Sequence, residues 1–215
     1  MNCLIIGGGD IDSSFAGNVI KQGGFDVIIA VDAGMEVLYG FGISPDVIVG
    51  DFDSVDEKIL TFFKEKPQIE ICSLNPQKDD TDTEHAIHYA IEHGASSISI
   101  LGGTGKRMDH FLGNVSLLGI GFGEAVSIEL LDANNRIRMV DRPVRISKAK
   151  QFGKYLSLIP YSGIVKDITV TGVKYPLNHE DLGGFNARGV SNEIIAEEAV
   201  IKFSDGILLV IESKD

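Results

Sequence analysis

The chain has 215 residues, of which 44% are hydrophobic and 23% charged, and its formal net charge at pH 7 is −12. These values are typical of a soluble globular protein and exclude a disordered chain. The acidic balance also argues against a nucleic-acid surface, because such a surface needs a basic stripe that displaces counterions from the phosphate backbone. Small ligands such as ATP remain open if a metal and a few local cations reverse the field at the site.

The first residues lack the basic start and long apolar stretch of a signal peptide, and no later run approaches the ~20 apolar residues of a membrane span. Cys3 and Cys72 both lie in apolar, strand-like runs, which favours buried reduced thiols over a disulfide. We therefore expect a cytoplasmic protein that does not contact a membrane.

Short β-rich runs alternate with amphipathic segments through residues 1–133. The predicted strands lie at 3–6, 27–31, 47–49, 69–74, 97–101 and 127–131, and the predicted helices lie near 14–22, 35–41, 55–66, 83–93 and 110–119. This alternation is typical of parallel βαβ units, in which ligands collect beyond the carboxyl ends of the strands. We expect an α/β domain over residues 1–133 with a mostly parallel sheet and a ligand site at that edge.

From about Asn134 the pattern changes to strands without a convincing helix between them. These strands are predicted at 136–140, 144–147, 155–159, 165–171, 200–203 and 207–212. The run Ser204-Asp205-Gly206 predicts a hairpin turn between the last two. We expect a second, all-β domain over residues 134–215, folded as a small sandwich.

Five carboxylates lie in two short segments at predicted strand ends. Gly50–Ser54 contains Asp51 and Asp53, and the segment 78–82 contains Lys78 with three further aspartates: Asp79, Asp80 and Asp82. If the chain stays extended after Gly50, Asp51 and Asp53 point the same way and Phe52 turns into the core. Two carboxylates about 4 Å apart repel by roughly 4 kcal/mol at an effective dielectric near 20, and Mg²⁺ converts that repulsion into attraction. The two segments therefore predict a magnesium site.

Helix capping is the simpler alternative for part of each acidic segment. Ser54 is a candidate N-cap for a helix from Val55, and Thr81 with Glu84 forms a plausible capping box. Capping needs one acceptor, whereas residues 78–82 supply three acids and a cation. Spacing alone does not decide which of these acids face the metal.

Two weaker signals follow the first two predicted strands. Gly7-Gly8-Gly9-Asp10 allows backbone N–H groups to approach a phosphate at a helix N-terminus, although a tight turn without a ligand explains it equally well. It matches neither the dinucleotide-binding fingerprint nor a Walker A loop. Asp32, at the end of the second strand, is either a helix N-cap or a residue that reaches the metal or a cationic substrate.

Gly102–His110 is a predicted loop between a strand and a helix. Its glycines, with Thr104 and Gly105 at its centre, permit close approach of the backbone to a ligand. Lys106 and Arg107 offer positive charge to phosphate oxygens, and Arg107 can do so bidentately. Asp109 and His110 then enter the helix, where His110 is either a site residue or only a core or capping residue. Together with the acidic segments, this loop suggests a site for a metal-bound polyphosphate.

These motifs together resemble the thiamin pyrophosphokinase family, which transfers pyrophosphate from ATP to thiamin and releases AMP. The family pattern Gly-Asp-x-Asp-Ser is met by Gly50–Ser54, an acidic segment ending in Thr-Asp by Asp79–Asp82, and Gly-Gly-x-x-Gly-x-Arg-x-Asp-His by Gly102–His110. The later segments 157–160, 171–177 and 189–192 are also similar to it. The match spans nearly the whole chain in order.

The resemblance implies an N-terminal domain that holds Mg-ATP, a C-terminal sandwich that binds thiamin, and a homodimer whose interface builds the thiamin site from both subunits. The implied metal ligands are Asp51, Asp53 and Asp79. The implied catalytic residues are Asp51, Asp53, Asp79, Asp82, Arg107 and Asp109. The implied ATP-binding residues are Gly8, Gly9, Asp10, Asp32, Lys78, Thr104, Gly105, Lys106, Arg107 and His110. The implied vitamin-binding residues are Asp109, Ser191 and Asn192.

The chain contains no Trp, so any aromatic stacking on thiamin must come from Phe or Tyr, and Tyr175 and Phe185 are the candidates. Two other functions remain open from the sequence. One is a pyrophosphokinase for another hydroxymethyl heterocycle, such as a pterin, because the chemistry on the ATP side is the same. The other is a non-catalytic sensor of a nucleotide or of thiamin diphosphate, although a sensor has little need for so many acids.

Overall fold

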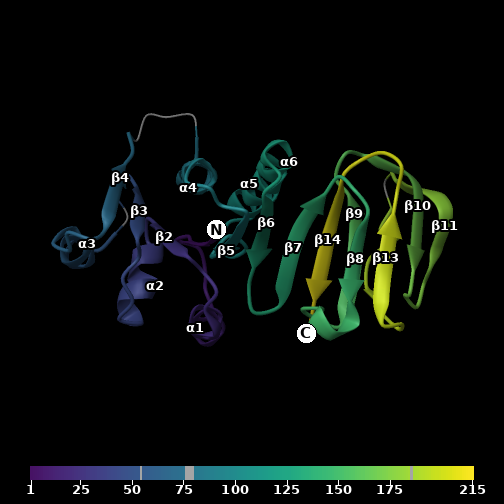
Figure 1. Cartoon of the computed structure of the whole chain (residues 1–215), viewed down its shortest axis with the longest axis horizontal. Helices are drawn as coiled ribbons and strands as arrows, with labels where there is room; N and C mark the ends of the chain where they lie inside the picture. The colour runs from purple at the N-terminus through teal and green to yellow at the C-terminus, as the bar shows by residue number, and fades with distance from the viewer. Residues whose placement is uncertain (54, 76–79, 185) are drawn as a thin grey trace. The chain divides into compact units, whose positions relative to one another are not determined.

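A computed structural model describes residues 1–53, 55–75, 80–184 and 186–215 (Figure 1). Ser54, Lys78, Asp79 and Phe185, which the sequence marks as candidates for a cap, a site or stacking, lie outside these ranges. The chain forms two compact units, Met1–Ala133 and Asn134–Asp215. In the described part of the chain, no helix has the length and apolar character needed to cross a membrane.

The first unit alternates parallel strands with helices. Its strands are β1 (Asn2–Ile6), β2 (Val27–Val31), β3 (Val47–Gly50), β4 (Glu70–Ser73), β5 (Ser97–Leu101) and β6 (Ser127–Leu131). Its helices are α1 (Ser13–Gln22), α2 (Gly34–Gly40), α3 (Glu57–Lys64), α4 (Asp82–Glu92), α5 (Met108–Leu117) and α6 (Gly121–Glu124), with the 3₁₀ turn η1 (Leu118–Ile120) before α6. The sheet order is β6-β5-β1-β2-β3-β4, and every described pair is parallel. The predicted α/β class is confirmed.

The strand order places a topological switch point beside β1. The chain starts in the middle of the sheet, builds outward to β4, and then returns to β5 on the other side of β1. The residues of Cys3–Ile6 are no more than 1% exposed, as expected for a strand covered on both faces. In open sheets of this kind the loops after the two strands at the switch point diverge and leave a crevice.

Short polar side chains fix the helix starts of this unit. Asp12 accepts a hydrogen bond from the Phe15 N–H (2.7 Å) and caps α1. Asp56 caps α3, so the prediction that this helix begins at Val55 is wrong by two residues. Thr81 caps α4 as predicted, accepting from the Glu84 N–H at 3.2 Å.

The second unit is an antiparallel β sandwich, as predicted. Its strands are β7 (Asn135–Val140), β8 (Val144–Ser147), β9 (Tyr155–Pro160), β10 (Ile164–Thr171), β11 (Leu177–Gly183), β12 (Asn192–Glu193), β13 (Glu198–Lys202) and β14 (Leu208–Ser213), with the 3₁₀ turn η2 (Lys148–Lys150) after β8. Within this unit the strands run in the orders β12-β9-β14-β7 and β11-β10-β13-β8. Leu158 and Val210 from the first order pack with Ile168 and Ile201 from the second in one buried core.

One expectation for this unit is wrong, and two strands, β11 and β12, were not predicted. The turn Ser204–Gly206 does not close a hairpin, because β13 pairs with β8 and β10 while β14 pairs with β7 and β9. The turn instead carries the chain from one sheet to the other. Strand β11 was not expected because its sequence is polar, and its pairing with β10 is interrupted by register shifts.

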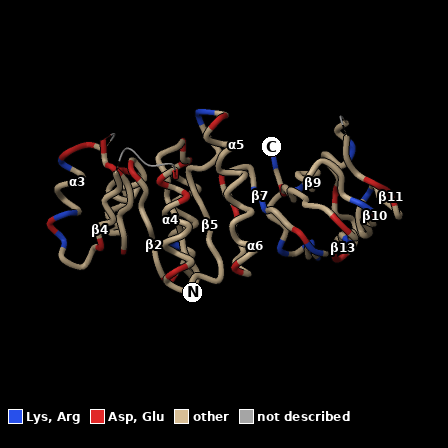
Figure 2. Tube along the Cα trace, turned by 90° about the horizontal axis from the view of Figure 1, so that it is seen from above, with Lys and Arg blue, Asp and Glu red and all other residues tan. Residues whose placement is uncertain are grey.

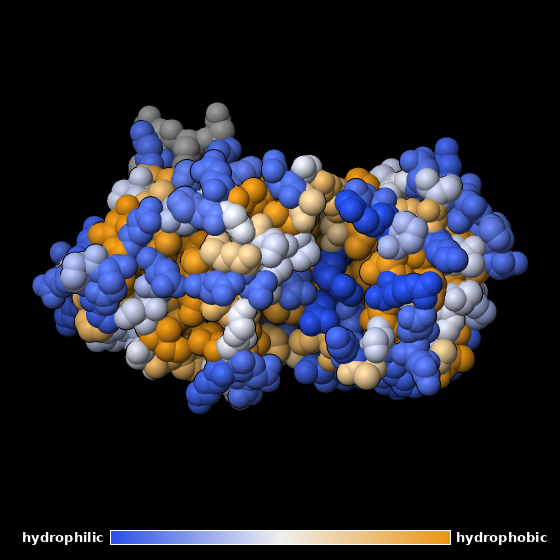
Figure 3. All heavy atoms as spheres, viewed as in Figure 1, coloured by the Kyte–Doolittle hydropathy of each residue, from blue (hydrophilic) through white to orange (hydrophobic). Residues whose placement is uncertain are grey.

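The face shown in Figure 3 carries many hydrophilic residues with hydrophobic ones visible between them. Glu212 is charged but buried, with an exposure of only 1%. Its Oε1 accepts from Arg138 Nη2 at 2.7 Å and lies 3.7 Å from Arg136 Nη1, and its Oε2 accepts from the Phe152 N–H at 2.9 Å. This network ties β14 to β7.

We expect Glu212→Ala to lower the free energy of unfolding by about 3–5 kcal/mol, because it leaves two guanidinium groups without their buried partner. The matched control is Glu198→Ala, which removes an ion pair with Arg145 between side chains that are 46% and 64% exposed. Its expected cost is below about 1 kcal/mol. Urea unfolding of both variants measures the difference, and equal losses would contradict a special role for the buried network.

Candidate functional site

The carboxyl ends of four strands in the first unit meet at one edge of the sheet. The Gly7 N–H donates to the Leu101 carbonyl at 2.9 Å, and the Asp32 N–H donates to the Val49 carbonyl at 3.1 Å. The loops after β1, β2, β3 and β5 therefore start side by side. This is the convergence that the sequence predicts for its glycine- and aspartate-rich segments.

A cavity of about 690 Å³ lies at this edge. Its lining includes many of the predicted residues: Gly8, Gly9, Asp32, Asp82, Gly105, Lys106, Arg107, Asp109 and His110. Of the candidates for this site within the described ranges, Asp10, Asp51, Asp53 and Thr104 do not line it. Acidic and basic positions adjoin at the start of α5 in Figure 2, where the loop that carries Lys106 and Arg107 enters the helix.

Glycines from the loops after β1 and β5 are prominent in the cavity lining. A Cβ on Gly9 would lie 2.2 Å from the Gly102 carbonyl oxygen, and a Cβ on Gly105 would lie 2.6 Å from the Asp10 Cβ. The loop after β1 and the loop after β5 are thus in direct contact. The N-terminus of α1 is already capped by Asp12, so a phosphate at this site would meet the loop backbone and not that helix terminus.

We expect Gly9→Ala to destabilise the protein by about 2 kcal/mol and to weaken nucleotide binding, because the added Cβ forces the two loops apart. The control is Gly40→Ala at the end of α2, where an added Cβ meets no described atom within 4 Å. There we expect a gain of about 0.5 kcal/mol from the better helix former. Thermal unfolding and ATP titration of both variants measure these effects, and a neutral Gly9→Ala would contradict the close packing.

Asp32 does not cap α2, because that helix begins after Ala33 without a side-chain cap. Its carboxyl group instead hydrogen-bonds to that of Asp82. Burial raises the pKa of Asp32 to about 7, with further contributions from the Asp82 hydrogen bond and from the charges of Asp82 and Asp51, against an opposing hydrogen bond from the Phe52 N–H. Within the described residues, its Oδ1 is buried without a hydrogen-bond partner.

The chain does not stay extended after Gly50, so the predicted alternation of Asp51 and Asp53 is wrong. Phe52 has a φ of 64° and the Asp53 N–H donates to Asp51 Oδ1 at 3.1 Å, which closes a tight turn. Phe52 is buried, as expected, at 8% exposure. The turn leaves Asp53 exposed, whereas Asp51 stays close enough for its charge to act on Asp32.

These acids fit a divalent cation. Asp32, Asp51 and Asp82 concentrate negative charge around a buried carboxylate oxygen without a partner, and hard oxygen ligands are those that Mg²⁺ prefers. No group of three or more His, Cys, Asp or Glu side chains in ready metal-binding geometry occurs among residues 1–53, 55–75, 80–184 and 186–215. Asp79, the third predicted ligand, lies outside those ranges.

Arg107 and Asp109, which both line the cavity, form a bidentate ion pair. Arg107 Nε donates to Asp109 Oδ1 at 3.1 Å and Nη2 donates to Oδ2 at 2.5 Å. The guanidinium group lowers the pKa of Asp109 to about 2, and the carboxylate raises the pKa of Arg107. Lys106 Nζ lies 3.4 Å from Asp10 Oδ1. The backbone of Lys106 has a φ of 63°. Both cations are therefore held by exposed acids.

Sequence reasoning missed several lining residues on helices: Thr83, Glu84, Asn114 and Leu117. Thr83 and Glu84 follow Asp82 in the first turn of α4. Asn114 and Leu117 lie four and seven positions after His110 on α5, which is the spacing of one helix face. That periodicity is the signal that could have identified them.

The second unit has its own cavity of about 370 Å³. Its lining is Leu158, Val170, Tyr175, Pro176, Leu177, Ala187, Arg188, Gly189, Val190 and Asn192. Of the predicted vitamin-binding residues here, Asn192 lines the cavity and Ser191 lies next to it in sequence with a φ of 59°. Tyr175, a stacking candidate, also lines it.

The fold and the first cavity define a class: an α/β protein with a glycine-rich, acid-rich site at the switch point of a parallel sheet, followed by an antiparallel β sandwich. Residues 23–129 match the family model "Thiamin pyrophosphokinase, catalytic domain", and residues 143–208 match "Thiamin pyrophosphokinase, vitamin B1 binding domain". The chain belongs to the thiamin pyrophosphokinase family.

Individual relatives agree with this assignment. The chain is 36% identical over 187 residues to thiamine pyrophosphokinase of Bacillus subtilis, covering 87% of each protein. It is 27% identical over 175 residues to thiamine pyrophosphokinase 1 of rice, covering 77% of this chain and 64% of the rice protein. A crystal structure of the Bacillus subtilis enzyme superposes with a TM-score of 0.88 at 34% identity over the full length of both chains.

Proposed function

We propose that this protein is an ATP-dependent diphosphotransferase that converts thiamin to thiamin diphosphate and releases AMP. The proposal rests on the first cavity, whose lining combines Lys106 and Arg107 with the hydrogen-bonded pair Asp32 and Asp82 and with several glycines. Such a site suits a polyphosphate, because backbone and cations can approach it closely. Membership of the family supplies the vitamin as the acceptor.

Among the residues that the structure describes, four acids and two cations line this cavity, so a free triphosphate would be repelled. The acids are Asp32, Asp82, Glu84 and Asp109, and the cations are Lys106 and Arg107. When bound, Mg²⁺ would neutralise phosphate charge and orient the triphosphate. Asp32, Asp51 and Asp82 would hold it, with Asp53 and Asp79 as the further candidates from the sequence.

In the transfer, the hydroxyl oxygen of thiamin attacks the β-phosphorus in line, a new P–O bond forms, and the bond from the β-phosphorus to the AMP oxygen breaks. Lys106 and Arg107 stabilise the charge on the transferring group. A carboxylate of the cavity takes the hydroxyl proton. Asp109 is a weaker base than Asp32, because its ion pair with Arg107 lowers its pKa to about 2, whereas the pKa of Asp32 is raised to about 7.

On the acceptor side, we propose that Ser191 and Tyr175 of the second unit meet the vitamin and that Asn192 belongs to the same site. The proposal includes a homodimer whose two copies complete each site, as the resemblance implies. Light scattering should then give about twice the chain mass of 23.2 kDa. We also propose a cytoplasmic location, consistent with two cysteines that are free thiols.

The experiment that tests the function is a coupled assay of AMP release from Mg-ATP with candidate alcohols. We expect rapid release with thiamin and none with a hydroxymethyl pterin. Release only with the pterin would favour the other pyrophosphokinase. Tight binding of thiamin diphosphate without AMP release from any alcohol would favour a sensor.

A further inference from the structure

Tyr175 lines the second cavity and combines two unusual features. The residue is 61% exposed, although its backbone is hydrogen-bonded to the buried residue Asn192, which is 8% exposed. The next residue, Pro176, fixes φ and cannot donate a hydrogen bond, so the chain leaves its strand pairing here. An exposed aromatic ring on a fixed backbone is a preorganised contact for a ligand.

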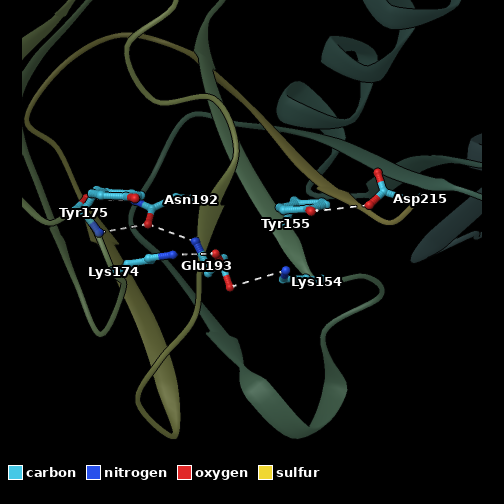
Figure 4. A network of polar contacts seen from close by, with 7 residues as sticks. All are labelled: Lys154, Tyr155, Lys174, Tyr175, Asn192, Glu193 and Asp215. Atoms are coloured by element: carbon cyan, nitrogen blue, oxygen red, sulfur yellow. Dashed lines mark hydrogen bonds and ion pairs between the residues drawn. The ribbon is translucent and has the colours of Figure 1, made fainter.

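The carboxamide of Asn192 holds the backbone of Tyr175 from both sides. Its Oδ1 accepts from the Tyr175 N–H at 3.0 Å, and its Nδ2 donates to the Tyr175 carbonyl at 2.8 Å (Figure 4). The same Oδ1 also accepts from the Glu193 N–H at 2.9 Å. The Asn192 side chain thus makes the two hydrogen bonds to the backbone of Tyr175 that a neighbouring strand would make in a sheet.

This contact extends a short antiparallel pairing by one residue. Val173 and Ile194 form an isolated bridge, and the Lys174 N–H donates to the Glu193 carbonyl at 2.9 Å. Beyond Lys174, the side chain of Asn192 supplies the next hydrogen bonds. The corner at Tyr175 and Pro176 is therefore fixed at the point where backbone pairing ends.

Buried contacts anchor Asn192 in turn. Asn192 pairs with Leu156 of β9, and the N–H of the preceding Ser191 donates to Ser157 Oγ at 2.9 Å. Ser157 is itself only 7% exposed. The clamp is thus built on the core of the sandwich, and its carboxamide oxygen is fully used by two backbone donors.

We infer that Asn192 is a positioning residue, which fixes the ring of Tyr175 against the vitamin and does not itself recognise it. This inference rests on the proposed function. Beside the ring, Lys174 Nζ lies 5.5 Å from its centroid and is held by Glu193 Oε1 at 3.0 Å (Figure 4). Glu193 Oε2 also lies 3.9 Å from Lys154 Nζ, so Glu193 forms ion pairs with two lysines close to the ring. In the proposed complex this ring receives the cationic thiazolium of thiamin, and the carboxylate offsets the positive charge of the lysines there.

A double-mutant cycle tests the inference, using Asn192→Ala, Tyr175→Ala and the double variant in the full-length enzyme. We expect each single change to raise KM for thiamin about tenfold, with kcat and KM for ATP within about twofold of wild type. The double variant should show no more than the larger single effect, because Asn192 acts through Tyr175. Independent effects that multiply to about a hundredfold would overturn the inference, as would an unchanged KM in Asn192→Ala.

Asn192→Asp covers the case in which Asn192→Ala does not fold. It keeps the shape and the Oδ1 acceptor of the two backbone donors, but it replaces the Nδ2 donor to the Tyr175 carbonyl with an oxygen that cannot donate, so the same non-additive rise in KM is expected. Tyr161→Ala, at an exposed tyrosine outside the cavity lining, is the control and should leave KM unchanged. If wild type forms no AMP with thiamin, the proposed function fails; if wild type is active and the cycle is additive, only this inference fails.

Discussion

Asp32→Asn is expected to reduce AMP formation by about 10²-fold or more and, at the same time, to stabilise the metal-free protein at pH 8. The loss of activity follows from removing the acid whose buried Oδ1 has no described partner in the cavity. The gain in stability follows from removing a charge that the empty site cannot neutralise. The same residue is thus costly for folding and required for function.

The pH dependence of this gain has a defined sign. The folded-state pKa of Asp32 is about 7, above its ordinary value of 3.8, so the folded protein binds more protons than the unfolded chain between those values. The contribution of neutral Asp32 to the free energy of unfolding is fully present below pH 4 and is lost as the pH rises through 7. Asparagine does not titrate, so the free energy of unfolding of Asp32→Asn increasingly exceeds that of wild type as the pH rises from 4 to 8. The difference reaches the order of 2 kcal/mol, allowing for partial solvent exposure.

Thermal unfolding of both proteins in EDTA, from pH 4 to pH 8, measures this difference. A gain of that size corresponds to a rise in Tm of several degrees at pH 8 for a protein of this length, at about 2–4 °C per kcal/mol. Asp46→Asn is the control, since Asp46 is an exposed acid whose carboxylate accepts from the Ile28 N–H at 2.8 Å, a bond that the amide oxygen can keep. A variant less stable than wild type at pH 8 would contradict the charge argument.

Arg107→Ala is expected to lower kcat by about 10²–10³-fold, because the guanidinium group is the planar cation that lines the cavity next to Lys106. Arg107→Lys keeps the charge but loses the two-pronged geometry, so only part of the activity should return. The fold should be unaffected, since both partners of the Arg107–Asp109 pair are about two-thirds exposed.

The matched control is Arg142→Ala in the second unit. Arg142 pairs with Asp141 in the same kind of exposed local ion pair, with Nε 2.8 Å from Oδ1. Steady-state kinetics with thiamin and Mg-ATP should show wild-type values for this control. Similar losses in both arginine variants would mean that exposed charge, and not the cavity, explains the effect.

The sequence predicted the placement of the site because strand ends in a parallel sheet converge by topology alone. Asp32, Asp82 and the Gly102–His110 loop are brought to one cavity for that reason. The backbone conformations of the loops could not be predicted in the same way. The turn at Phe52 depends on a hydrogen bond from Asp53 to Asp51, which spacing alone does not reveal.

The second unit shows the limits of pattern reasoning more clearly. Strand β11 has no alternating apolar pattern and is held through an irregular pairing with β10. The turn Ser204–Gly206 has hairpin chemistry but joins two sheets, which only tertiary packing decides. Likewise, Asn192 is a recognisable polar residue in the sequence, whereas its contact with Tyr175 exists only in the folded chain.

We propose that the acids Asp32, Asp51 and Asp82 act together to hold Mg²⁺ with a triphosphate. Calorimetric titration of ATP into the protein, with Mg²⁺ and with EDTA, tests it most directly when wild type and Asp32→Asn are compared. We expect ATP to bind wild type saturably and only with Mg²⁺, and to bind the variant much more weakly. Equal ATP binding with and without Mg²⁺, or equal binding by both proteins, would contradict it.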